Sequence, residues 1–265
     1  MSGTGNDFIV IDNRKGVIPD ESKHNFIKRV CTPKTSVGAD GVIFIESSDS
    51  VDFRWDFYNA DGSSAEMCGN GCRCVAMYAY ERDIAGKNMT FETIAGMISA
   101  EVNGNSVKIQ MTSPQDFRQN LNISLEDSTI EVDSLNTGVP HAIIYCENVE
   151  NQDLKKTGAA VRHHSCFAPS GTNVNFVQVI DGQTLKIRTF ERGVEGETLA
   201  CGTGAVASAI LAGCKGLVKS PTTVKIASGE TLKIHFDNND YNGSFGTVFL
   251  EGPAITTFEG TINDS

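Results

Sequence analysis

The sequence has no long apolar run and no basic stretch. No apolar segment reaches the roughly 18 to 20 residues that a membrane span needs, and the mean hydropathy is slightly negative. The N-terminal segment MSGTGNDFIVID lacks the basic region followed by an apolar region that is typical of a signal peptide. We therefore expect a globular, cytoplasmic protein that has no membrane partner.

Basic residues are few as well. Lys and Arg number 22 against 33 Asp and Glu, which gives a formal net charge of −11. An acidic protein repels phosphate backbones, and no run of Lys and Arg supplies a basic patch. We therefore expect no nucleic-acid partner. Low-complexity segments and long linkers are also absent, so the 265 residues are available for two ordinary domains.

Most segments have the pattern of strands, in which β-branched and aromatic residues are punctuated by Gly, Asn and Asp. The predicted strands are 7–12, 41–46, 51–59, 106–111, 141–146, 174–180, 184–190, 231–236 and 246–252. Helices are predicted at 22–31, 71–82 and 204–216. The last two are rich in Ala and apolar on nearly all sides, as a helix buried inside a sheet should be.

An internal repeat relates the two halves of the chain. Three pairs share a spacing of 133 residues: Cys68 in CGNG and Cys201 in CGTG (201 − 68), Phe57 and Phe190 (190 − 57), and Gly96 and Gly229 (229 − 96). One spacing shared by strand, Cys-Gly-x-Gly, helix and hairpin indicates two homologous domains. We predict an α+β fold of two pseudo-symmetric domains, each a mostly antiparallel sheet wrapped around a central helix. The first domain is residues 1–115, with 253–265 returning to it, and the second is 116–252.

Each Cys-Gly-x-Gly places a cysteine just before a helix N-terminus, where backbone N–H groups and the positive end of the helix dipole favour anions. This environment favours the thiolate, and the glycines let N–H groups approach a carboxylate closely. If the halves face each other, two thiols flank one carboxylate-bearing carbon. One thiolate can then remove the α-proton of an amino acid while the opposite thiol returns one, without a cofactor or a metal.

Six ordered segments resemble the diaminopimelate epimerase family. They are GTGNDFIVID, GADGVIFIE, FYNADGSSAEMCGNGCRC, GVPHAII, GTNVNFV and FERGVEGETLACGTGAVASA. The resemblance implies a cofactor-independent, cytoplasmic and homodimeric isomerase that interconverts LL- and meso-diaminopimelate on the route to lysine and peptidoglycan. It therefore also implies a small-molecule amino-acid substrate.

The resemblance also implies the roles of individual residues. Cys68 and Cys201 would be the acid/base pair. The backbone of Gly69, Asn70, Gly202 and Thr203 would hold the reacting carboxylate. Glu191 and Asn6 would orient the reacting amino group, and Arg192 would pair with the distal carboxylate, helped by Asn59 and Asn173.

Three features depart from the family pattern. Gly41 stands where the family often has Gln, and Val139 stands where it often has Asn. Neither residue can donate a side-chain hydrogen bond, so both are left outside the candidate site. Family members usually have a short strand before the SGTGNDF segment, and we expect that strand to be missing or cut short here.

Other interpretations remain open. Cys68, Cys72 and Cys74 have a C-x3-C-x-C spacing, but no second pair of zinc ligands follows at the usual separation. A proline or hydroxyproline racemase-like enzyme shares the two-cysteine logic, although a cyclic imino acid offers Arg192 no distal carboxylate. A binding or thiol-redox protein without turnover is a third possibility. His141, which follows Pro140, is expected to be a structural or supporting histidine at a turn rather than a general base.

Overall fold

The computed structural model describes residues 1–65, 67–126, 128–237 and 245–262. The chain forms two compact units, Met1–Ile109 with Gly252–Ser265, and Gln110–Glu251. The domain boundaries predicted from the sequence stay a prediction. Among the described residues, no helix has the length and apolar content that a membrane span requires.

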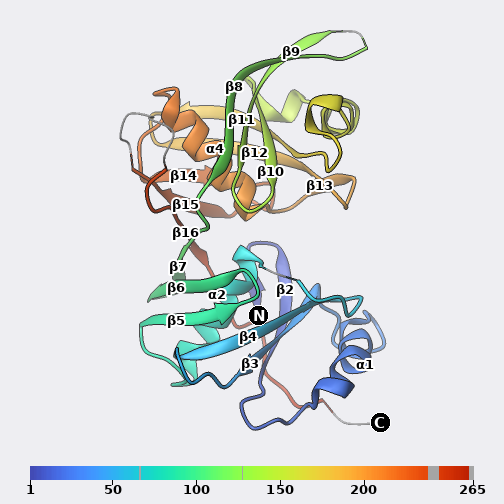
Figure 1. Cartoon of the computed structure of the whole chain (residues 1–265), viewed down its shortest axis with the longest axis vertical. Helices are drawn as coiled ribbons and strands as arrows, with labels where there is room; N and C mark the ends of the chain where they lie inside the picture. Colours follow the sequence, from blue (N-terminus) through green and yellow to red (C-terminus); the bar gives the residue numbers. More distant parts are fainter. Residues whose placement is uncertain (66, 127, 238–244, 263–265) are drawn as a thin grey trace. The chain divides into compact units, whose positions relative to one another are not determined.

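The first unit is a mixed sheet with two helices (Figure 1). Its strands are hydrogen-bonded in chain order. The β2–β3 and β4–β5 pairs are parallel, and the other pairs are antiparallel. The elements are β1 (Ser2–Gly3), β2 (Asn6–Asp12), α1 (Asp20–Cys31), β3 (Gly41–Glu46), β4 (Phe53–Asn59), α2 (Gly69–Glu81), β5 (Asn88–Thr93), β6 (Gly96–Asn103) and β7 (Ser106–Gln110).

The second unit repeats this plan. Its sheet order is β16-β15-β14-β12-β11-β10-β9-β8, and β13 pairs with β12. The strands are β8 (Gln115–Ser124), β9 (Thr129–Asn136), β10 (Pro140–Tyr145), β11 (Asn173–Asp181), β12 (Thr184–Glu191), β13 (Gly196–Thr198), β14 (Thr222–Lys225), β15 (Thr231–His235) and β16 (Phe249–Pro253). The helices are α3 (Ala159–Arg162) and α4 (Gly202–Cys214), with shorter turns η1 (Val149–Asn151), η2 (Leu154–Gly158) and η3 (Ser165–Phe167).

The internal repeat is confirmed by the pairing pattern of the two sheets. The β10–β11 and β12–β14 pairs are parallel, as are β2–β3 and β4–β5, and the strand pair that follows each is antiparallel. Helices α2 and α4 both begin and end 133 residues apart (202 − 69 and 214 − 81). The two halves therefore share one fold.

Each sheet curves around one apolar helix, as predicted. Helix α2 packs against β1, β2, β3 and β6, and α4 packs against β9–β12, β14 and β15. Every residue of α4 from Gly204 to Ala212 is buried, which explains why its sequence shows no polar face. The fold class predicted from the sequence is confirmed, and the sheets are mixed.

Several elements were not predicted. The long β8–β9 hairpin lies in a segment where the sequence suggested only a domain boundary, and Figure 1 shows it as the green hairpin of the second unit. The strand β1 precedes β2 as a two-residue edge strand, and Ser2 also forms a bridge with Ile255.

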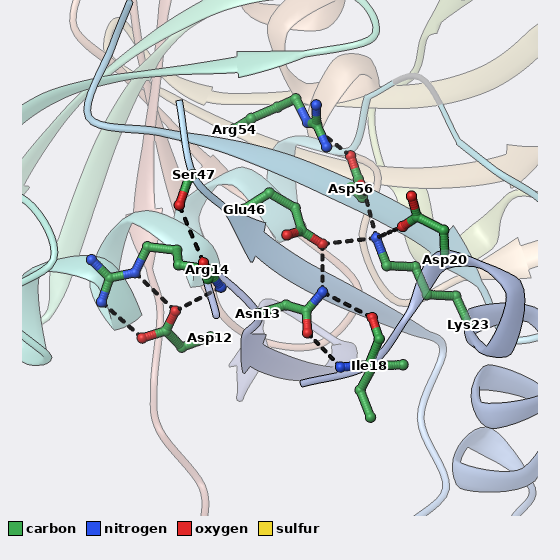
Figure 2. A network of polar contacts seen from close by, with 10 residues as sticks. All are labelled: Asp12, Asn13, Arg14, Ile18, Asp20, Lys23, Glu46, Ser47, Arg54 and Asp56. Atoms are coloured by element: carbon green, nitrogen blue, oxygen red, sulfur yellow. Dashed lines mark hydrogen bonds and ion pairs between the residues drawn. The ribbon is translucent and has the colours of Figure 1, made fainter. Parts of the chain in front are cut away.

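Helix α1 is attached to the first sheet through a buried lysine (Figure 2). The Nζ of Lys23 lies 2.7 Å from Asp20, 2.7 Å from Glu46 and 2.9 Å from Asp56. Burial works to lower the pKa of this ammonium, but hydrogen bonds to the three carboxylates outweigh it and leave the pKa raised. Lys23 thus fixes α1 against β3 and β4.

Candidate active site

A cysteine caps the N-terminus of each central helix. Cys68 precedes α2 and Cys201 precedes α4, both with extended backbone (φ −144° and −137°). The Cys68 Sγ accepts a hydrogen bond from the Gly71 N–H at 3.5 Å, whereas the Cys201 Sγ lies 3.6 Å from the Thr203 hydroxyl. The first N–H groups of an α-helix have no intrahelical partner. The structure therefore puts each thiol beside anion-binding N–H groups, on Gly69 and Asn70 in one unit and on Gly202 and Thr203 in the other.

The start of α2 lies beside the loop that leads into β2. The Asn70 Nδ2 donates to the Asn6 Oδ1 at 2.7 Å, and the Asn6 Nδ2 donates to Asp40 Oδ2 at 2.9 Å. The structure thus brings the predicted residues Asn6 and Asn70 into direct contact. Asn59, at the end of β4, donates instead to the Ser63 hydroxyl at 3.0 Å and holds its own turn.

A chain of buried polar groups leads to the start of α4. The Thr189 hydroxyl donates to Asn175 Oδ1 (2.9 Å), so the Asn175 amide nitrogen faces His141 Nδ1 (3.0 Å). The proton of the imidazole is then on Nε2, which donates to the Thr203 hydroxyl at 3.0 Å. The Thr203 proton is left to point at the Cys201 sulfur.

His141 is fully buried in β10 and does not lie at a turn, so its predicted placement was wrong. Burial, together with the nearby charge of Arg192, lowers its pKa to about 3. A neutral histidine of this kind supports its neighbours and does not act as a general base near neutral pH. The supporting role expected for it is the one the contacts favour.

The end of β12 joins three predicted residues. The Arg192 backbone N–H donates to the Asn173 Oδ1 at 2.8 Å, and the Arg192 guanidinium donates to the Ser170 carbonyl at 3.3 Å. The adjacent Glu191 is half-buried, and burial raises the pKa of its carboxyl. A basic and an acidic side chain therefore follow each other at the end of β12.

The structure explains why glycine stands at position 41. A Cβ at this position would lie 2.5 Å from the Tyr58 carbonyl oxygen and 2.7 Å from the Phe57 ring. A glutamine side chain would therefore need a shift of β4, which pairs with β3 here. Nothing in the structure explains Val139, whose carbonyl accepts a hydrogen bond from Thr137 N–H.

Cys72 and Cys74 are fully buried on α2. Burial raises the pKa of Cys72 well above its ordinary value and that of Cys74 to about 12. Both side chains therefore belong to the packed core around α2, as expected from their place on the helix.

Comparison with solved structures defines the class of fold. A phenazine biosynthesis protein of the PhzF family from Bacillus anthracis has a TM-score of 0.67 at 16% identity, covering 95% of both chains. A probable proline racemase from Agrobacterium radiobacter has the same TM-score at 15% identity, covering 92% of this chain and 82% of the other. At these identities the likeness shows the fold alone.

Sequence comparison is more specific. The family model for diaminopimelate epimerase matches residues 1–116 and 134–256. A diaminopimelate epimerase from Aquifex aeolicus is 46% identical, over 100% of this chain and 96% of the relative, and one from Hydrogenobaculum is 48% identical over 98% and 96%. The chain belongs to the diaminopimelate epimerase family, whose members are isomerases that act on an amino acid.

Proposed function

We propose that this protein interconverts LL- and meso-2,6-diaminopimelate through a thiolate/thiol pair, Cys68 and Cys201. The observation that carries the proposal is the pair of cysteine caps at equivalent helix N-termini, in a chain that is 46% identical to a diaminopimelate epimerase over its whole length. Stereoinversion at a carbon needs a base on one face and an acid on the other. Two chemically equal groups serve both directions of a reversible reaction.

In the proposed mechanism, one thiolate removes the α-proton and the opposite thiol delivers a proton to the other face of the same carbon. Electron density moves into the carboxylate, which takes on enediolate character. The N–H groups of Gly69, Asn70, Gly202 and Thr203 stabilise that charge, since they begin helices and point away from them. The acid/base chemistry is supplied by the side chains of the chain itself, so the mechanism uses no cofactor and no metal.

The rest of the substrate is assigned to the polar groups around the helix starts. Asn6 and Glu191 orient the reacting amino group. Arg192 binds the distal carboxylate, helped by Asn59 and Asn173. Two contacts support this assignment. The Arg192 backbone N–H already binds Asn173, and the guanidinium has further N–H donors for a carboxylate besides the one that binds the Ser170 carbonyl.

The biological setting follows from the family. We infer a cytoplasmic homodimer that acts on a small-molecule amino-acid substrate in the biosynthesis of lysine and of peptidoglycan precursors. A proline or hydroxyproline racemase-like activity is the alternative. Arg192 argues for diaminopimelate as the substrate, because a cyclic imino acid has no second carboxylate that the guanidinium could bind.

The test is proton exchange in D2O. The reduced protein is incubated with LL-diaminopimelate, L-proline or L-glutamate, and the α-proton signal is followed by NMR. We expect deuterium incorporation and formation of the meso isomer with the first substrate only. Cys68→Ala and Cys201→Ala should abolish turnover, while Cys146→Ala, a half-buried thiol outside the candidate site, should retain it. Exchange with proline in place of diaminopimelate would establish the racemase alternative and remove the role of Arg192.

A further inference from the structure

A buried arginine lies one turn into α2, next to the Cys68 cap. Arg73 is 0% exposed, although a charged side chain is rarely buried without strong contacts. Its guanidinium donates to Thr4 Oγ1 at 2.6 Å, Asn70 Oδ1 at 2.9 Å and the Gly69 carbonyl at 3.2 Å. Two of these contacts, to Asn70 and Gly69, thus lie at the helix start assigned to the substrate carboxylate, and Thr4 lies in the turn before β2.

These contacts determine how the Asn70 amide is turned. Asn70 Oδ1 accepts from both Arg73 and the Thr4 hydroxyl (3.1 Å). A guanidinium has donors only, so the amide oxygen must face it. The Asn70 amide nitrogen is therefore directed at Asn6 Oδ1, where it donates at 2.7 Å.

The same order continues to a carboxylate. Asn6 Oδ1 accepts from Asn70, so Asn6 Nδ2 faces outward and donates to Asp40 Oδ2 at 2.9 Å. A carboxylate has acceptors only. The Asn70 and Asn6 amides thus lie head to tail between the Arg73 cation and the Asp40 anion. Rotating either amide by 180° would place donor against donor on one side of it and acceptor against acceptor on the other.

Arg73 also holds the backbone of the helix start. In a trans peptide the C=O of Gly69 and the N–H of Asn70 point in opposite directions. Because the Gly69 carbonyl is bound by Arg73, the Asn70 N–H is held pointing away from the helix. That N–H is one of the groups assigned to the reacting carboxylate.

We propose that Arg73 is a positioning residue for the epimerisation, which fixes the donor and acceptor ends of the Asn70 and Asn6 amides and the direction of the Asn70 N–H. The inference rests on the proposed function. Arg73 acts through Asn70 and Asn6 and does not itself contact the substrate. A further bond, from Nε to the Pro253 carbonyl at 3.4 Å, serves the fold.

A double-mutant cycle separates positioning from a purely structural role. Arg73→Met and Arg73→Lys are made in the wild-type chain and in an Asn6→Ala/Asn70→Ala chain, and kcat/KM for LL-diaminopimelate is measured. We expect Arg73→Met to lower kcat/KM by about 100-fold in the wild-type chain and by about 10-fold when both amides are already gone, because that chain keeps the backbone N–H which Arg73 orients through the Gly69 carbonyl. Arg73→Lys keeps the charge but not the fork of donors, so we expect an intermediate loss.

Arg82→Met is the matched control. Arg82 caps the other end of the same helix, is 43% exposed and pairs with Glu259. We expect its substitution to leave kcat/KM unchanged. Circular dichroism and thermal unfolding of every variant are recorded alongside.

Each outcome has one meaning. An inactive wild-type protein overturns the proposed function. An active wild type whose loss on Arg73→Met is equally large in both backgrounds overturns positioning through the amides and leaves the epimerase intact. If Arg73→Met does not fold, the other end of this hydrogen-bond chain decides: Asp40→Ala removes the acceptor that faces Asn6, and full activity of that variant would overturn the inference.

Discussion

Gly71 and Gly204 occupy equivalent positions in α2 and α4 (204 − 71 = 133), yet the structure gives them different amounts of room. A Cβ on Gly204 would lie 2.3 Å from Asn175 Oδ1 and 3.1 Å from the Cys201 Sγ. A Cβ on Gly71 would lie 3.3 Å from both the Ile43 Cδ1 and the Trp55 Cζ3. The first is a clash, and the second is a tight contact that small movements relieve.

We therefore expect Gly204→Ala to destabilise the protein and Gly71→Ala to be nearly neutral. Alanine at 204 must displace Asn175, which is bonded to Thr189 and His141 in the buried chain. Each buried hydrogen bond lost costs about 1–3 kcal/mol, while alanine favours a helix over glycine by about 1 kcal/mol. The net loss is roughly 2–4 kcal/mol for Gly204→Ala and below about 1 kcal/mol for Gly71→Ala.

Urea unfolding of the two variants provides the measurement, read as a change of midpoint at constant slope. A second comparison isolates the cause. In an Asn175→Ala chain the clashing oxygen is absent, so Gly204→Ala should then cost little. Equal stability of Gly71→Ala and Gly204→Ala, or an undiminished cost in the Asn175→Ala chain, would refute the reasoning.

Two further predictions concern buried charge. Lys23→Met removes the cation shared by Asp20, Glu46 and Asp56, of which Asp56 keeps its contact with Arg54, and should destabilise the protein by about 3 kcal/mol. Because ligand oxygens of these three lie within 4.8 Å of one another, added Ca²⁺ should raise the melting temperature of that variant and not of the wild type; an equal shift in both would count against this. The pKa of His141 is about 3 when folded, against an ordinary value of 6.5, so its neutral form stabilises the fold above pH 6.5 and this contribution is lost as pH falls from 6.5 toward 3. Over that window the wild type should lose up to about 1.4 kcal/mol more per pH unit than His141→Gln, and parallel pH profiles would exclude the effect.

The fold was predictable because its signal is periodic. Alternating strands, two apolar helices and a constant spacing of 133 residues all persist in the structure as two copies of one unit. The β8–β9 hairpin was missed although Leu121 and Ile123 of β8 alternate with Asn120 and Asn122, because this alternation is short and only Ile123 of the strand is buried. Propensity carries little information where one face of a strand is not buried.

The two thiols were predictable from local sequence, because a helix cap is a local structure. Apart from His141, their supporting groups were not, because Thr4, Asp40 and Arg73 meet only in the fold, as does Asn175 with His141. One signal was available. A charged residue inside an otherwise apolar helix is costly unless it is bonded, and Arg73 in CGNGCRC is such a residue.

The two cysteines, although related by the repeat, have different neighbours. The Cys68 Sγ accepts from the backbone N–H of Gly71, whereas the Cys201 Sγ faces the Thr203 hydroxyl, whose proton is aimed by neutral His141. Thr203→Val keeps the side-chain shape and removes this donor, so we expect kcat/KM to fall by about 10- to 100-fold.

The fall should be the same in both directions of the reaction. The equilibrium constant between the stereoisomers is a property of the substrates and is the ratio of kcat/KM in the two directions. A less stabilised Cys201 thiolate therefore lowers kcat/KM by the same factor in both directions. Thr203→Ser restores a hydroxyl at the same place and should recover most of the activity, which initial rates from LL- and from meso-diaminopimelate would show. Full activity of Thr203→Val, or a loss that Thr203→Ser shares, would mean that the hydroxyl serves only to satisfy the buried imidazole N–H, and that the different surroundings of the two sulfurs have no consequence for catalysis.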